Sequence, residues 1–111
     1  MATEATRAGE FLVSEANGSR SRESITVTGG PYPAGQVLGK ITASGKYTAY
    51  AAGASDGTET AAAVLWSAAD GSDADVSAAA IVRDAEVSEA LLTGEDADAI
   101  TDLAAVGIIA R

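Results

Sequence analysis

The chain has 111 residues, a formal net charge of -9, and neither cysteine nor histidine. This length suits one domain. The absence of cysteine and histidine excludes disulfides, thiolate nucleophiles, imidazole bases and the usual zinc ligands. An acidic surface repels phosphates, so we expect no nucleic-acid binding. We also expect no membrane span and no signal peptide, because no apolar run is long enough.

Alanine dominates the apolar residues. The sequence holds 26 alanines but only 21 residues of Leu, Ile, Val and Phe together. A methyl side chain buries little area, so a monomer would have a modest core. We therefore expect contacts with other subunits or with a partner to add stability.

An extended segment follows a polar tail over residues 1–9. Residues 11–14 alternate in polarity, Asn17-Gly18 is a strong turn signal, and residues 19–28 are predicted as a strand that ends at residues 29–31. Alternate side chains of residues 19–28 form two faces, and neither is apolar enough to predict a buried sheet face. This strand is therefore expected to lack a partner within its own chain.

The middle of the chain predicts a hairpin and further strands. Ser44-Gly45 is a tight reversal between strands over residues 36–42 and 46–50. Further strands are expected over residues 62–67 and 76–83, with a polar loop at 54–60 and an acidic loop at 70–75. Residues 83–92 fit either a continued strand or a helical turn.

A short helix is predicted near the C-terminus. Thr93 is the expected N-cap, and the acids that follow suit the positive end of the helix dipole. Ile100, Leu103 and Val106 share a helical face, and Gly107 is a plausible terminator before a strand over residues 108–110. The predicted class is mainly β (α+β) with one short C-terminal helix.

Carboxylates suggest two alternative functions. Glu95, Asp96 and Asp98 could serve a small carboxylate-dependent hydrolase, but five aromatic residues are too few to line a pocket that raises a carboxyl pKa. An acidic calcium-binding adhesion module is the other alternative, although its candidate ligands, Asp70, Asp73 and Asp75, do not have EF-hand spacing. We expect no enzyme activity, small-molecule substrate, cofactor or metal.

The remaining large side chains are interpreted as packing residues. In a chain with so few of them, Tyr47, Tyr50 and Trp66 are expected to anchor the core or a subunit interface.

Five segments stand in a characteristic order: GEFLVSEANGSRSRES (9–24), AGQVLGKITASGKYTAY (34–50), ASDGTETAAAVLW (54–66), AAAIVRDAEV (78–87) and LAAVGIIAR (103–111). Together they resemble the head decoration proteins of tailed phages, the group related to decoration protein D of phage lambda. The resemblance implies a small β-clip-like fold and a non-enzymatic protein of the outer capsid surface, assembled in the host cytoplasm. It also implies that the protein forms homotrimers at three-fold and quasi-three-fold sites of the expanded head. These trimers would stabilise the head against the pressure of packaged DNA.

The same resemblance implies two functional regions along the chain. Residues 1–28 would be an N-terminal arm, largely unstructured in the free trimer, that pairs with a strand of the major capsid protein. Residues 29–111 would be the β-rich decoration domain. We expect two arm arginines to meet capsid carboxylates, and the full set of expected capsid contacts is Phe11, Val13, Arg20, Arg22, Ile25 and Val27.

Overall fold

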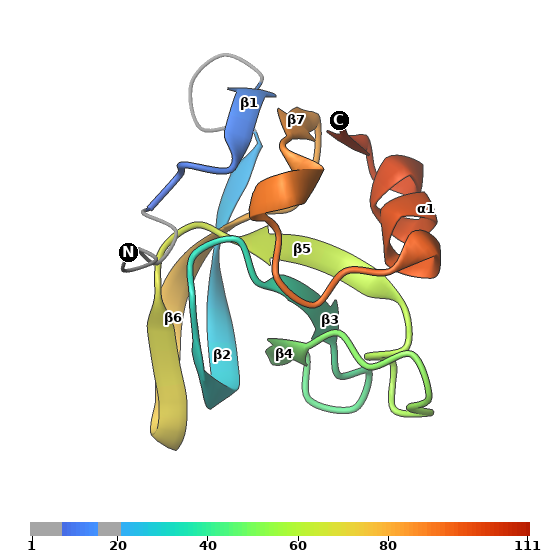
Figure 1. The fold of residues 1–111 in the computed structure, drawn as a ribbon. Coiled ribbons are helices and arrows are strands. Elements are labelled where there is room, and N and C mark those ends of the chain that lie inside the picture. The colour runs from blue at the N-terminus through green and yellow to red at the C-terminus, as the bar shows by residue number, and fades with distance from the viewer. Residues whose placement is uncertain (1–7, 16–20) are drawn as a thin grey trace, which may run out of the picture.

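The computed structural model describes residues 8–15 and 21–111, and it is mainly β (Figure 1). Within these ranges the only α-helix is α1, near the C-terminus, as predicted. No helix of the described chain is long and apolar enough to cross a membrane. The elements are β1 (Leu12–Glu15), β2 (Arg22–Tyr32), β3 (Val37–Lys40), β4 (Tyr47–Ala49), β5 (Ala61–Leu65), β6 (Ala69–Ile81), β7 (Ala85–Val87), the 3-10 helix η1 (Glu89–Leu91), α1 (Ala97–Ala105) and β8 (Ile108–Ala110).

Five strands close into a barrel in the order β2-β4-β3-β5-β6. Its longest pairing is antiparallel, between β2 and β6, and extends from Arg22 opposite Ile81 to Tyr32 opposite Ala69. The predicted hairpin is confirmed, since β3 and β4 pair antiparallel across the reversal at residues 41–46. Closure removes most of the free strand edges that an open sheet of this size would expose.

The other three strands form a small sheet in the order β1-β7-β8. β7 runs antiparallel to β1 and parallel to β8, so the predicted last strand is confirmed. In Figure 1 this sheet lies above β5 with α1 beside it, and α1 contacts both β8 and β5. Strands from opposite ends of the chain therefore meet in one sheet.

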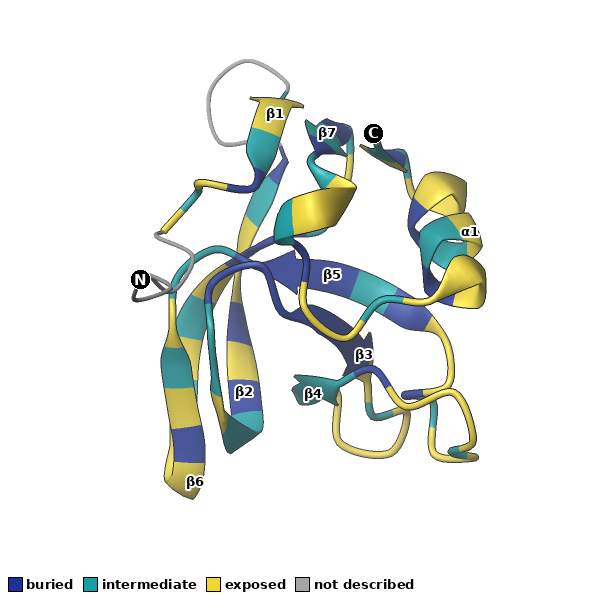
Figure 2. Ribbon diagram, in the orientation of Figure 1, coloured by how far each residue is buried: buried dark blue, intermediate teal, exposed yellow. Residues whose placement is uncertain are grey.

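Two apolar clusters lie on opposite faces of β3 and β5. One fills the barrel between β2, β3, β5 and β6, and the other lies between the barrel wall, the small sheet and α1. Consecutive residues Val64 and Leu65 belong to different clusters because side chains alternate along a strand. The dark blue of β5 in Figure 2 reflects this burial on both faces, which explains its continuous apolar sequence AAAVL.

The structure corrects two expectations about the strands. β2 does not stop at residues 29–31 but continues to Tyr32, with shifts in its register against β6. The acidic segment 70–75 is part of the 13-residue strand β6 rather than a loop. Gly71 permits the close approach of these strands, because a Cβ there would lie 2.5 Å from the Val27 carbonyl oxygen.

A third correction concerns burial. Part of the face of β2 judged too polar to be buried does pack inside the barrel, where Val27 is fully buried and Ile25 nearly so. Small and medium side chains from β3, β5 and β6, such as Leu38, Leu65 and Ala80, complete that interior. The partner of this strand is therefore β6 of the same chain.

The helix begins later than expected. Asp96, not Thr93, is the N-cap of α1, and its carboxylate accepts a hydrogen bond of 2.8 Å from the Ala99 amide. Leu103 and Ala99 are buried, whereas Val106 of the predicted apolar face is exposed. Gly107, in the left-handed region at φ 85°, follows the last turn as predicted.

Candidate functional site

β1 is an edge strand with an exposed apolar side chain. β7 pairs with one of its edges, and no described strand pairs with the other. Val13 is 55% exposed, which places it among the exposed large hydrophobic residues of the described chain. An unpaired row of backbone donors and acceptors is a template for another strand, so this edge is the best candidate for contact with a partner.

The segment before β1 is fastened to the body of the protein. Phe11 is fully buried, and its carbonyl oxygen accepts a hydrogen bond of 2.7 Å from the Ser88 amide. The Gly9 amide donates to the Trp66 carbonyl oxygen at 2.9 Å. Phe11, which was expected to contact a partner, instead contributes to the chain's own core.

Trp66 is the point where several of these contacts meet. Its indole packs edge-on against the Phe11 ring, with centroids 6.1 Å apart and planes inclined at 76°. The Arg22 guanidinium carbon lies 3.8 Å from the indole centroid, a cation-π contact. Gly9 approaches so closely that a Cβ there would lie 2.6 Å from the indole ring.

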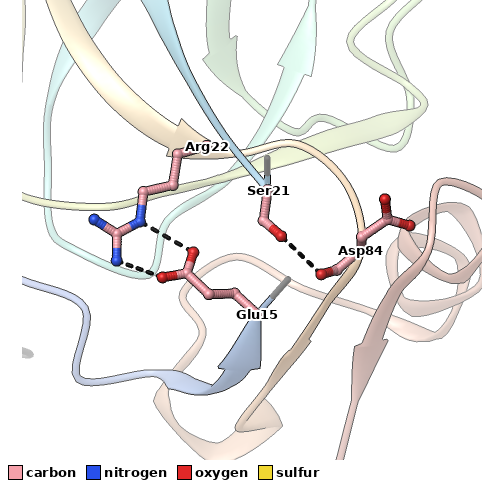
Figure 3. A network of polar contacts seen from close by, with 4 residues as sticks. All are labelled: Glu15, Ser21, Arg22 and Asp84. Carbon is pink, nitrogen blue, oxygen red and sulfur yellow. Dashed lines mark hydrogen bonds and ion pairs between the residues drawn. The ribbon is translucent and has the colours of Figure 1, made fainter. Parts of the chain in front are cut away.

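An ion pair joins the end of β1 to the start of β2 (Figure 3). Arg22 Nε donates to Glu15 Oε2 at 3.0 Å, and Nη2 donates to Oε1 at 2.5 Å. The hydrogen bonding of the Arg22 guanidinium to the Glu15 carboxylate is the main cause that raises the pKa of Arg22 above its ordinary value. We call Gly9, Phe11, Glu15, Arg22 and Trp66 the N-terminal clasp.

Ser21 fixes the start of β2 from the other side. Its side chain is fully buried, and its Oγ donates to the Asp84 carbonyl oxygen at 2.7 Å (Figure 3). The Val82 amide donates to the Ser21 carbonyl oxygen at 2.9 Å. The backbone on which Arg22 is mounted is thus held to the connection between β6 and β7.

The structure separates the side chains that were expected to act together. Ile25 and Val27 lie in the barrel interior, Val13 is exposed, and Arg20 lies outside the described residues. Tyr50 is buried near α1, while Tyr47 and Trp66 are half-buried. Glu15 was not singled out from the sequence, because no local pattern links it to Arg22 across the residues between them.

The acidic residues near α1 have structural partners. Asp96 accepts hydrogen bonds from the Tyr50 hydroxyl, at 3.0 Å and 3.2 Å to its two oxygens, in addition to capping α1. Asp102 Oδ2 accepts from the Ala61 amide at 3.0 Å. These carboxylates fasten α1 to the barrel rather than face each other across a cavity.

Two acidic residues of β6 also have partners within the chain. Asp70 accepts hydrogen bonds from the amide and hydroxyl of Ser72, and these lower its pKa. Asp75 pairs with Lys46 at 2.5 Å, which is the main cause that lowers the pKa of Asp75. Within the described chain, no group of three or more acidic side chains is placed to hold a metal ion.

An open cavity of about 170 Å³ lies where β2 ends and β6 begins. Its lining contributes one carboxyl group and is otherwise apolar or aromatic: Pro31, Tyr32, Ala68, Ala69 and Asp70. Glycoside hydrolysis and similar acid-base chemistry need a pair of carboxyl groups flanking the substrate. This lining does not supply such a pair.

Comparison with known proteins gave one family. The family model described as Bacteriophage lambda head decoration protein D matches residues 1–108. No curated protein and no solved structure matches the chain. The match covers both the barrel and the clasp, and it ends within β8.

Proposed function

This chain belongs to the bacteriophage lambda head decoration protein D family, and we propose that it binds as a homotrimer at the three-fold and quasi-three-fold sites of the expanded phage head. Membership makes it a structural capsid decoration protein, associated with the phage capsid and the virion. There it stabilises the shell against the pressure of packaged DNA. The observation that carries this proposal is a family match over residues 1–108.

The proposed partner is the major capsid protein, and the proposed contact is strand addition at β1. In that mode main-chain hydrogen bonds provide affinity and alternate side chains set the register. The open edge of β1 and the exposed Val13 support this proposal. Within the proposed arm, residues 1–28, we assign the contacts to β1, Val13 and Arg20, since Phe11, Ile25 and Val27 are buried in their own chain.

The proposed trimer follows from the same family and from the small core. Tyr47 and Trp66 are only half-buried, and this partial exposure supports a contact with a neighbouring subunit. Three copies of a weak strand contact on one trimer would act together by multivalency. Assembly onto the head would then occur in the host cytoplasm, where the expanded head forms.

A direct test is cosedimentation of the purified protein with expanded and unexpanded heads of its phage. We expect binding to expanded heads and a weakening by Val13→Glu, which places a charge on the exposed face of β1. Val106→Glu is a matched control, because Val106 is also exposed, at 41%, but lies after α1. Absence of binding to expanded heads, or equal effects of both variants, would contradict the proposal.

Sedimentation equilibrium tests the trimer separately. The expected mass is three times the 11.0 kDa of the chain, and the value should persist in Val13→Glu if β1 contacts the capsid rather than another subunit. A monomer at all concentrations would exclude the proposed trimer.

A further inference from the structure

We propose that the open cavity at the end of β2 binds an arginine side chain of the major capsid protein. Its lining comes from residues 31–32 of β2 and from residues 68–70 at the start of β6, and no residue of β1 contributes to it. The identity of the partner rests on the proposed function. The chemistry of the occupant follows from the lining of the cavity.

The size of the cavity favours a single side chain. Sites for small molecules usually have volumes of about 300–1,000 Å³ and enclose most of the ligand. This cavity is smaller, at about 170 Å³, and it is open. A side chain that projects from another protein needs no larger space, because the rest of its chain stays outside.

One wall of the cavity is an aromatic ring that is already held in place. The Tyr32 hydroxyl shares a hydrogen bond of 2.7 Å with Thr48 Oγ1. Gly29 permits this position, because a Cβ there would lie 2.9 Å from the Tyr32 hydroxyl oxygen. The Tyr32 backbone pairs with Ala69 between β2 and β6. A ring fixed at both ends can receive a side chain without first being ordered.

Asp70 is the charged residue among those that line the cavity. Its Oδ1 accepts hydrogen bonds from the Ser72 hydroxyl at 2.5 Å and the Ser72 amide at 3.0 Å. These bonds lower the pKa of Asp70, so the carboxylate is ionised at neutral pH. Within residues 8–15 and 21–111, no basic side chain pairs with Asp70. A carboxylate beside an apolar wall fits a cation that carries an apolar stem.

Arginine combines the properties that this lining would select. Its guanidinium is planar and always charged, so its N–H groups can donate to Asp70 while its face stacks on Tyr32. Its methylene stem can lie on the apolar wall beside Pro31 and Ala69. Lysine would supply the charge and the stem, but its compact ammonium does not stack in this way.

The charge of the chain favours a different protein, rather than a second copy, as the source of this arginine. There are 7 basic residues against 16 acidic ones. Four basic side chains are in ion pairs, and the Lys40 ammonium lies 5.9 Å from the centroid of the Tyr47 ring. The other two, Arg7 and Arg20, lie outside the described residues. A basic partner surface is attracted to this acidic chain, whereas a second copy is repelled.

An NMR titration of the isolated protein with n-propylguanidinium tests the cavity. We expect saturable shifts in the signals of residues 68–71 and of the Tyr32 ring, and no comparable shifts with neutral n-propylurea. Asp70→Asn keeps an oxygen that can accept from Ser72 but removes the charge, so it should weaken guanidinium binding about tenfold. Absence of shifts at the cavity, or equal shifts with n-propylurea, would overturn the proposal.

Two further variants separate the cavity from the general surface charge. Asp73→Asn is the matched control, because Asp73 is also an exposed aspartate of β6 but does not line the cavity. This variant should bind n-propylguanidinium as the wild type does. Ala68→Leu fills part of the cavity at an exposed position without changing the charge, and it should weaken binding as Asp70→Asn does. Equal losses in Asp70→Asn and Asp73→Asn would contradict a specific site.

Cosedimentation with expanded heads tests the occupant. Asp70→Asn and Ala68→Leu should each weaken head binding about tenfold, and Asp73→Asn should not. Unchanged head binding in both cavity variants overturns the proposal and leaves the proposed function standing. Loss of the trimer in Asp70→Asn, measured by sedimentation equilibrium, would identify a second copy as the occupant and also overturn it. If the wild type does not bind expanded heads, the proposed function fails, and the capsid occupant fails with it even where n-propylguanidinium still binds.

Discussion

At the scale of single residues, the Tyr50 hydroxyl links the segment directly after β4 to the start of α1. Burial, the hydrogen bond to Asp96 and the nearby Asp98 and Asp102 charges raise the pKa of Tyr50 to about 12. The unfolded chain ionises near the ordinary value of 10. The folded state therefore retains the proton longer, and this contribution to stability is complete below pH 10 and disappears as the pH rises to 12.

Tyr50→Phe should remove this pH dependence. We expect the free energy of unfolding of the wild type to fall more steeply between pH 10 and 12 than that of the variant, as measured by urea denaturation. Burial also raises the pKa of Tyr47, so Tyr47→Phe is a useful comparison: it leaves the Asp96 contact intact and should keep the contribution of Tyr50. Parallel curves for wild type and Tyr50→Phe would contradict the assignment.

At the scale of elements, α1 depends on one of the two acids at its N-terminal end, the N-cap Asp96 rather than the first-turn Asp98. Asp96 caps the helix through the Ala99 amide, whereas Asp98 is exposed and has no comparable backbone contact among those described. Loss of an N-cap costs about 1 kcal/mol. We therefore expect Asp96→Ala to lower the free energy of unfolding by at least about this amount, because it also leaves Tyr50 without its acceptor.

Asp98→Ala is the control for that substitution. It removes a first-turn charge of the same sign, which should change stability by only about 0.3–1 kcal/mol. Chemical denaturation of the two variants side by side measures the difference. Equal losses would mean that the charge, and not the cap, is what stabilises the start of α1.

At the scale of the whole molecule, the excess of acids sets the response to salt. The chain has 16 acidic and 7 basic residues, and Arg22, Lys46, Arg83 and Arg111 are already in ion pairs. The remaining acids repel one another, and salt screens that repulsion within about 10 Å at 0.1 M. We expect the thermal midpoint to rise when NaCl is increased from low to physiological concentration.

The control is the same titration near pH 4.2, the isoelectric point. Net repulsion is minimal there, so added NaCl should stabilise the protein much less than at neutral pH. A larger rise at pH 4.2 than at pH 7 would contradict this explanation.

Much of the fold could be predicted where the signals are local. Ser44-Gly45 marked the hairpin between β3 and β4, and Gly107 marked the end of α1, because turn and helix-end conformations depend on residues a few positions apart. The predicted loop over residues 70–75 was wrong, because this acidic segment is a strand only through the pairing of β6 with β2. The predicted cap, Thr93, was wrong: Asp96 caps the helix, and its carboxylate also accepts a hydrogen bond from Tyr50, which is far away in the chain.

The candidate site was harder to predict. The alternation around Ile25 and Val27 correctly placed both on one face of a strand, but it could not reveal that Leu38, Leu65 and Ala80 would cover that face. Arg22 was recognised as important, yet its partners Glu15 and Trp66 have no sequence pattern in common with it. The clasp exists only after the barrel has brought Trp66 beside the start of β2.

The sequence by itself determined the mainly β class, the hairpin, the end of the helix and the family, because these depend on neighbouring residues or on the order of segments along the chain. Only the tertiary structure decided which face of β2 is buried and which partner holds Arg22. Those outcomes depend on contacts between segments far apart in the chain, and barrel closure creates them.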